Sequence, residues 1–204
     1  TLVLTPSLRT RLLASADGSL WVAGLGQEAV RCDIGSRYWT TYLGLSYQCE
    51  DSSGRQWFVS DDSTVVCRDG GTWTRFGIAD GLMDLPRELI VAQDGTLWAA
   101  GSHAGVAATA QSNGSGWEFE THPGLSRGLR PEIYGSPDGD VWLAAGGGFN
   151  RNLGQQAGVL QYTEGGWQHH VPPEAPMFTY GITRTTDGTT WFCGRELHSL
   201  TGGE

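Results

Sequence analysis

Polar and apolar positions along this chain follow one phrase that returns five times. Each copy has a polar two-residue turn, a tryptophan three residues after the glycine of that turn, and then apolar or small residues, as in AQDGTLWAAG (92–101). Alternating apolar and polar residues around such a turn are typical of half-buried β-strands. The tryptophan recurs every 36 to 49 residues. These anchor tryptophans are Trp21, Trp57, Trp98, Trp142 and Trp191.

The turn before each anchor tryptophan predicts a β-hairpin. It is Asp-Gly in four copies and Ser-Gly, at Ser53 and Gly54, in the second. Asp-Gly between apolar runs favours a two-residue type I′ turn, whose central residues both have positive φ. A second tryptophan follows a Gly- or Asp-rich turn in four copies, where we expect the fourth strand to begin: Trp39, Trp73, Trp117 and Trp167. We interpret the nine tryptophans, the anchor set above all, as residues that pack the sheets.

Four antiparallel strands in a repeat of about 40 residues make a β-propeller blade. We therefore predict an all-β fold, a closed five-bladed β-propeller of four-stranded antiparallel blades, in a single domain over residues 1–204. The fifth copy lacks its second tryptophan, and the segment Thr1–Pro6 aligns with an outermost strand. We expect this N-terminal strand to close the last blade, which would remove a free sheet edge. The alternative is a five-repeat piece of a larger propeller.

Two copies carry a longer pattern. A Gly-Leu pair precedes ELIVAQDGTLWAAG within residues 81–101, and another precedes EIYGSPDGDVWLAAG within residues 124–146. In this pattern the chain resembles the two-component-regulator propeller family. The resemblance implies a ligand-sensing module of a signalling protein, and it alone favours an extracytoplasmic or periplasmic location. The chain differs from that family in its five repeats and in having no attached transmitter or membrane segment.

Composition excludes several classes of function. The net charge is −9 and all 13 basic residues are arginines without clustering, so we expect no nucleic-acid partner. The longest apolar runs are too short for a transmembrane helix. The four cysteines form no C-x-x-C pair, and we expect mostly buried free thiols, with the disulfide state left open. No cofactor or metal is predicted.

Counting back from the anchor tryptophans locates candidate site residues. In a propeller, the first strand of each blade lines the central channel. Ten residues before the anchors lie Arg11, Tyr47, Glu88, Glu132 and Gly181. A scaffold does not need this mixture, so we interpret it as a ring at the channel mouth; the alternative is ordinary solvated strand starts. Nearby strands and loops, including the long insertion 146–158, add Asp61, Asp62, His103, Tyr134, Phe149, Arg151, Asn152, Tyr180 and Arg195.

Three functions stay open at this point. The first is a non-enzymatic recognition or sensor module that binds a small polar ligand, such as a carbohydrate or other glycan. The second is a propeller glycoside hydrolase or polysaccharide lyase, with Glu88 and Glu132 as acid and base, since glycosidases use two carboxyl groups about 5–9.5 Å apart. The third is a protein-interaction platform for another protein domain, which requires an exposed apolar patch.

Overall fold

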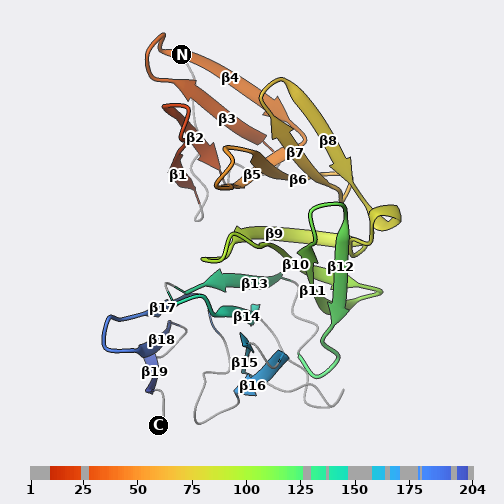
Figure 1. The fold of residues 1–204 in the computed structure, drawn as a ribbon, viewed down its shortest axis with the longest axis vertical. Coiled ribbons are helices and arrows are strands. Elements are labelled where there is room, and N and C mark those ends of the chain that lie inside the picture. Colours follow the sequence, from red (N-terminus) through yellow and green to blue (C-terminus); the bar gives the residue numbers. More distant parts are fainter. Residues whose placement is uncertain are drawn as a thin grey trace. The chain divides into compact units, whose positions relative to one another are not determined.

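The computed structural model describes residues 10–23, 28–125, 130–136, 138–146, 158–163, 166–170, 179, 181–193 and 197–201. Contacts within the chain form two compact units, Thr1–Asp80 and Gly81–Glu204. The regular structure of the described residues is antiparallel β-sheet, apart from one 3-10 turn at Ile78–Asp80 (Figure 1). Within these ranges, no helix has the length and apolar character needed to cross a membrane.

The first unit contains two four-stranded sheets with their strands in chain order (Figure 1). The strands are β1 (Arg11–Ala14), β2 (Ser19–Ala23), β3 (Glu28–Asp33), β4 (Tyr38–Leu43), β5 (Leu45–Glu50), β6 (Gln56–Ser60), β7 (Val65–Asp69) and β8 (Thr72–Phe76). Strand β5 of the second sheet packs against β2 and β3 of the first. The first strand of one repeat therefore covers the middle of the preceding sheet.

The second unit repeats this arrangement with two four-stranded sheets and one three-stranded sheet. Its strands are β9 (Leu85–Val91), β10 (Leu97–His103), β11 (Val106–Ser112), β12 (Trp117–Thr121), β13 (Arg130–Gly135), β14 (Val141–Gly146), β15 (Val159–Thr163), β16 (Gly166–His170), β17 (Gly181–Arg184), β18 (Thr189–Cys193) and β19 (Leu197–Thr201). Strand β13 packs against β9 and β10, so a first strand again lies on the preceding sheet.

The five sheets lie where the repeats predict them, with an anchor tryptophan in each second strand. The four further tryptophans lie in or at the start of the fourth strands, also as predicted. The last sheet has three strands among the described residues. The predicted closing strand, Thr1–Pro6, lies outside the described residues, so closure and a single propeller domain stay predictions.

All five hairpins close with the same turn, but it is not the type I′ turn that we predicted. In the third repeat, Gly95 N–H donates to the Ala92 carbonyl and Ala92 N–H donates to the Thr96 carbonyl, both at 2.9 Å. The other four repeats have the same two bonds. Only the glycine has positive φ, +85° at Gly95, whereas Asp94 does not. This is a three-residue loop, a type I turn followed by a left-handed glycine that forms a bulge.

The aspartate of the turn accepts a hydrogen bond from the backbone N–H two residues later. Asp94 Oδ1 accepts from Thr96 N–H at 2.8 Å, and Asp187 Oδ1 accepts from Thr189 N–H at 3.0 Å. Hydrogen bonds from the Thr185 hydroxyl and from Thr189 N–H hold the pKa of Asp187 below its usual value. These contacts occupy the carboxylates of Asp94 and Asp187 inside their own hairpins, so these Asp-Gly turns are scaffold.

Three of the five anchor tryptophans pack between consecutive sheets of one unit, which confirms their predicted role. Trp21 lies in a core cluster with Tyr47 and Phe58, so it joins the first and second sheets. Trp98 packs in the cluster that joins the third and fourth sheets, and Trp142 in the one that joins the fourth and fifth. Each of these three side chains is at most 3% exposed. Their burial contributes a large part of the apolar area that stabilises each pair of sheets.

The tryptophans of the fourth strands do not share one environment. Trp117 is 4% exposed, whereas Trp39 on β4 and Trp73 on β8 are 44% and 42% exposed. Trp73 covers the edge of the aromatic cluster of the first unit, with its ring 5.7 Å from that of Tyr42. The prediction that all nine tryptophans pack the sheets is therefore wrong for Trp39, which lies on the outermost strand of its sheet.

Replacing Gly95 by alanine should destabilise the third hairpin. A Cβ at φ +85° meets no atom within 4 Å, so the cost is the left-handed backbone itself. We expect Gly95→Ala to lower the free energy of unfolding, measured by urea denaturation, by about 1 kcal/mol.

Gly71 offers a matched control for this substitution. A Cβ there also meets no atom within 4 Å, and its φ is not in the left-handed region. Gly71→Ala should change the free energy of unfolding by less than about 0.5 kcal/mol. Equal losses in the two variants would contradict the assigned role of Gly95.

Candidate functional site

Three first strands carry their predicted site residue in one common register. Glu88 on β9 pairs with Ala100, and Glu132 on β13 pairs with Ala144, in each case two residues after the anchor tryptophan. Arg11 on β1 pairs with Ala23 in the same way, and its side chain is exposed. The hairpin turn therefore places the tenth residue before the tryptophan at an equivalent point of these sheets.

Tyr47 breaks this pattern and is not a surface site residue. A β-bulge at Gln48 shifts the pairing, so Tyr47 lies opposite Phe58, one residue after the anchor. The shift turns its side chain toward the core, where it is 1% exposed and stacks on Trp21 at 4.6 Å and 3°. Burial raises the pKa of Tyr47 above its usual value. The sequence prediction for Tyr47 is wrong, because counting residues cannot detect a bulge.

Glu88 and Glu132 lie on neighbouring first strands of the second unit. The Ile133 backbone N–H donates to Glu88 Oε2 at 3.1 Å, so the Glu88 carboxylate reaches the strand that carries Glu132. Because β13 is the first strand of its sheet, this N–H points away from β14, and Glu88 satisfies it from the preceding sheet. The structure thus brings the Glu88 carboxylate to the strand that carries Glu132.

Tyr134 completes this group of side chains. It lies two residues after Glu132, on the same face of β13, and its hydroxyl donates to Glu132 Oε2 at 2.5 Å. Glu132 is 6% exposed and Glu88 is half-buried. These three residues lie on the contacting strands β9 and β13, and we call Glu88, Glu132 and Tyr134 the inner-strand site.

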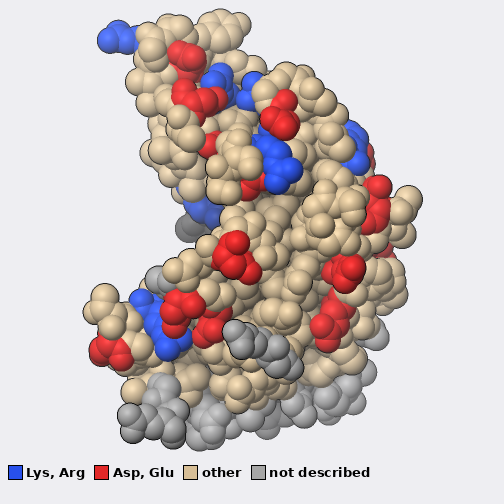
Figure 2. Space-filling model, in the orientation of Figure 1, with Lys and Arg blue, Asp and Glu red and all other residues tan. Residues whose placement is uncertain are grey.

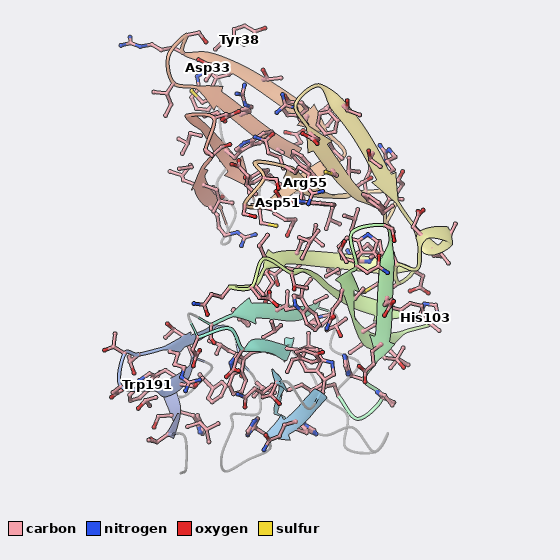
Figure 3. The ribbon with its side chains drawn as sticks, in the orientation of Figure 1. Asp33, Tyr38, Asp51, Arg55, His103 and Trp191 are labelled. Carbon is pink, nitrogen blue, oxygen red and sulfur yellow. The ribbon has the colours of Figure 1, made fainter. Side chains whose placement is uncertain are left out.

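His103 lies in the same unit but has other partners. It is the last residue of β10 (Figure 3). The next two residues, Ala104 and Gly105, have φ of +48° and +75°. They form a type I′ turn, the type that we predicted for the Asp-Gly hairpins. The His103 ring contacts Phe119 at 4.4 Å, and its Nδ1 lies 3.9 Å from Asp84 Oδ2. Asp84 also accepts from Ala104 N–H at 2.9 Å.

Asp61 and Asp62 lie in the first unit and form a hairpin turn. Ser60 N–H donates to the Thr64 carbonyl, and Ser63, with φ +62°, takes the place that glycine has in the other turns. Asp62 pairs with Arg75 at 2.8 Å, and hydrogen bonds from the Ser60 and Thr64 hydroxyls keep the pKa of Asp62 low. Asp62 therefore has the structural role of the Asp-Gly aspartates. Phe149, Arg151, Asn152, Tyr180 and Arg195 lie outside the described residues.

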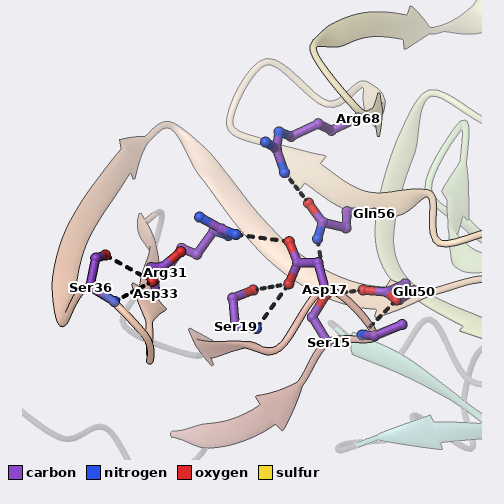
Figure 4. A network of polar contacts seen from close by, with 10 residues as sticks. Ser15, Asp17, Ser19, Arg31, Asp33, Ser36, Glu50, Gln56 and Arg68 are labelled. Atoms are coloured by element: carbon purple, nitrogen blue, oxygen red, sulfur yellow. Dashed lines mark hydrogen bonds and ion pairs between the residues drawn. The ribbon is translucent and has the colours of Figure 1, made fainter.

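Sequence analysis missed a position that links neighbouring sheets, seven residues before the anchor tryptophan. In the first unit this residue is Glu50, which accepts from the Ser15 hydroxyl and, at 2.9 Å, from Ala16 N–H in the preceding hairpin turn (Figure 4). Gln56 donates to Ser15 Oγ at 3.1 Å and accepts from Arg68 at 2.5 Å (Figure 4). These bonds satisfy polar groups that are buried where the two sheets meet.

In the second unit the same position is Arg184. It pairs with Asp138 and, at 3.1 Å, with Asp140, both in the preceding hairpin, and its Nε donates to the Gly188 carbonyl at 3.0 Å. Figure 2 shows that basic and acidic side chains are interspersed over the face drawn there. A cavity of about 230 Å³ opens beside these residues, lined by Asp138, Arg184, Thr185, Thr186 and Gly188. Because Glu50 makes the equivalent link, we assign Arg184 first to sheet packing.

His122 is a buried titratable group of the second unit, and no pattern in the sequence singles it out. It is 6% exposed, its Nε2 lies 2.8 Å from the Thr109 hydroxyl, and its ring lies 5.0 Å from that of Trp167. Burial lowers the pKa of His122 to about 4. Across the described part of the chain, no three His, Cys, Asp or Glu side chains gather in a way that could hold a metal ion.

Comparison with known proteins identifies the fold. The sequence matches no protein-family model and no curated protein. Virginiamycin B lyase from Staphylococcus aureus aligns with 93% of this chain and 68% of its own at a TM-score of 0.66 and 14% identity. Regucalcin from Agrobacterium tumefaciens, described as a calcium-binding protein, aligns with a TM-score of 0.56 and 15% identity. The alignment covers 93% of this chain and 68% of regucalcin. YCF48 bound to a D1 peptide aligns with a TM-score of 0.56 and 16% identity. The alignment covers 90% of this chain and 61% of YCF48.

These likenesses show that the chain has a propeller-type fold. At 14–16% identity they show the fold alone. These three proteins differ in what they bind or cleave, and none is a two-component regulator. The resemblance to that family therefore rests on the repeat pattern, and function has to be argued from the inner-strand site.

The stability of the chain should fall between pH 6.5 and 4 because of His122. The pKa of His122 is about 4 in the folded chain, below the ordinary value of 6.5, so the unfolded chain binds this proton more tightly. Stability is therefore complete above pH 6.5 and decreases as the pH falls. We expect the free energy of unfolding to be about 2 kcal/mol lower at pH 5 than at pH 7.5.

Urea denaturation of His122→Gln tests this assignment. The variant lacks the titrating ring, so the loss between pH 7.5 and pH 5 should largely disappear. His103→Gln, which replaces a partly exposed histidine, should keep it. The assignment fails if both variants keep the pH dependence of the original chain.

Proposed function

We propose that this chain is a non-enzymatic ligand-binding propeller whose site is the inner-strand site of the second unit. The observation that carries the proposal is the contact between β9 and β13, where the Ile133 N–H, next to Glu132, donates to Glu88 Oε2 at 3.1 Å. Hydrophobic packing alone would favour apolar side chains at such inward positions. Charged groups there have a cost in desolvation, which a ligand with complementary groups offsets.

The chemistry of the side chains indicates the class of ligand. A carboxylate has about four acceptor sites for hydrogen bonds, and when ionised it donates none. A matching ligand presents hydroxyl or ammonium groups. A sugar, an amino sugar or a small amine has these groups, and a phosphate or a carboxylate does not. We therefore expect a small, hydrogen-bond-donating polar ligand.

The finer parts of the proposal rest on resemblance. Similarity to the two-component-regulator repeats implies that ligand binding serves sensing and signal transduction outside the cytoplasm. Phe149, Arg151, Asn152, Tyr180 and Arg195 stay candidates for additional ligand contacts. Asp61 and Asp62 are weaker candidates, because hydrogen bonds within their turn already engage Asp62.

The second candidate is a glycan hydrolase or lyase with Glu88 and Glu132 as acid and base. It is favoured by the same pair of carboxylates, since such chemistry needs two of them near one sugar. A lyase among the structural neighbours adds only that this fold accommodates catalysis. Turnover of an oligosaccharide that is lost in Glu88→Gln and in Glu132→Gln, with cooperative unfolding retained, would favour this candidate over simple binding.

A thermal-shift screen of neutral hexoses, amino sugars and small amines tests the primary proposal. A ligand that binds the folded chain alone stabilises it by about 2.7 kcal/mol at a hundredfold excess over its Kd. We expect at least one stabilising compound, and we expect Glu88→Gln and Glu132→Gln each to abolish its shift, because each removes one negative charge.

Glu118→Gln is the matched control. Glu118 is exposed on β12, outside the inner-strand site, so this variant should keep the full shift. A shift that survives both site substitutions would show that the compound binds elsewhere. A shift lost equally in the control would show that net charge, rather than the inner-strand site, determines binding.

A further inference from the structure

Strand β4 has an exposed outer edge with an unusual composition. It is the last strand of its sheet, and no described strand pairs with its outer side (Figure 1). Its sequence, YWTTYL, has no charge, proline or glycine, and consists of aromatic, β-branched and aliphatic residues. Tyr38 is 69% exposed, Leu43 75% and Trp39 44%. Short uncharged segments of this kind pair readily with other strands.

The other outermost strands carry ionisable side chains. Strand β8 contains Arg75, β12 contains Glu118 and Glu120, and β16 contains His169 and His170. Charged residues on an edge strand hinder pairing with other chains. Among the four-stranded sheets, β4 is thus the outermost strand that lacks this protection.

We propose that β4 pairs antiparallel with β4 of a second copy of this chain. A two-fold axis that exchanges antiparallel strands must pass through one residue position, which then faces itself. With the axis at Thr40, Thr40 faces the partner's Thr40, Trp39 faces the partner's Thr41, and Tyr38 faces the partner's Tyr42. Thr–Thr, aromatic–β-branched and aromatic–aromatic pairs are each favourable across antiparallel strands.

The absence of charge on β4 favours a second copy over a charged partner. Each chain has a net charge of −9, so two copies repel each other at long range, but β4 adds nothing to this repulsion. A single pair of short strands buries less area than a standard interface, so we expect a Kd on the order of 10 μM. Raising the salt concentration should strengthen the dimer, because it screens the repulsion.

Sedimentation velocity on the full chain and on charge variants at Thr40 tests this pairing. Thr40→Lys alone and Thr40→Glu alone place like charges opposite each other across the axis. We expect each to raise the Kd at least about tenfold. An equimolar mixture of the two variants should form a heterodimer, because a lysine then faces a glutamate. Cooperative thermal unfolding of each variant shows that it is folded.

The same pair of substitutions at Thr41, to lysine and to glutamate, is the matched control. Thr41 faces the partner's Trp39 in this register, so mixing Thr41→Lys with Thr41→Glu should restore no dimer. Glu118→Lys on β12 should leave the association of the original chain unchanged. The proposal is overturned if the original chain sediments as a monomer at about 1 mM, if Thr40→Lys dimerises normally, or if mixing restores the dimer at Thr41 rather than at Thr40.

Discussion

The left-handed glycine that closes each first hairpin is the constraint on which the rest of the molecule depends. It forms a type I turn with a bulge in all five repeats, at φ between +77° and +101°. The turn fixes which residue of the first strand lies opposite the anchor tryptophan. Trp21, Trp98 and Trp142 then fill the space between their own sheet and the next sheet of the same unit. One backbone conformation therefore sets both the register within a sheet and the contact between sheets.

Contacts between sheets solve a recurring problem of this architecture. The first strand of each sheet has one side without a partner strand, and its polar backbone groups have to be satisfied from elsewhere. Glu88 does this for Ile133 N–H, and Glu50 does it for a neighbouring turn at Ala16 N–H. Glu88 thus has two roles, because it makes a structural hydrogen bond and also belongs to the inner-strand site. A carboxylate anchored in this way is preorganised for a ligand.

Much of this fold could be predicted from the sequence, because the signals are local. The Asp-Gly turns and the tryptophan spacing located all five sheets, and the count from the tryptophans placed Glu88 and Glu132 at equivalent positions. Predictions failed where a single residue alters geometry without altering the pattern. The bulge at Gln48 moved Tyr47 into the core, and the turn type depended on φ at the aspartate, which a dipeptide does not specify. Burial of His122 and the link made by Arg184 depend on contacts between repeats.

The contact between Glu88 and β13 is where the scaffold and the proposed site meet, and the amide exchange rate of Ile133 measures it directly. Hydrogen exchange followed by NMR should show Ile133 protected in the original chain, because its N–H donates to Glu88 Oε2 at 3.1 Å. In Glu88→Ala, protection at Ile133 should fall at least about tenfold, while β10 and β14 keep theirs. Unchanged protection at Ile133 would contradict the contact between Glu88 and β13 on which the site is built.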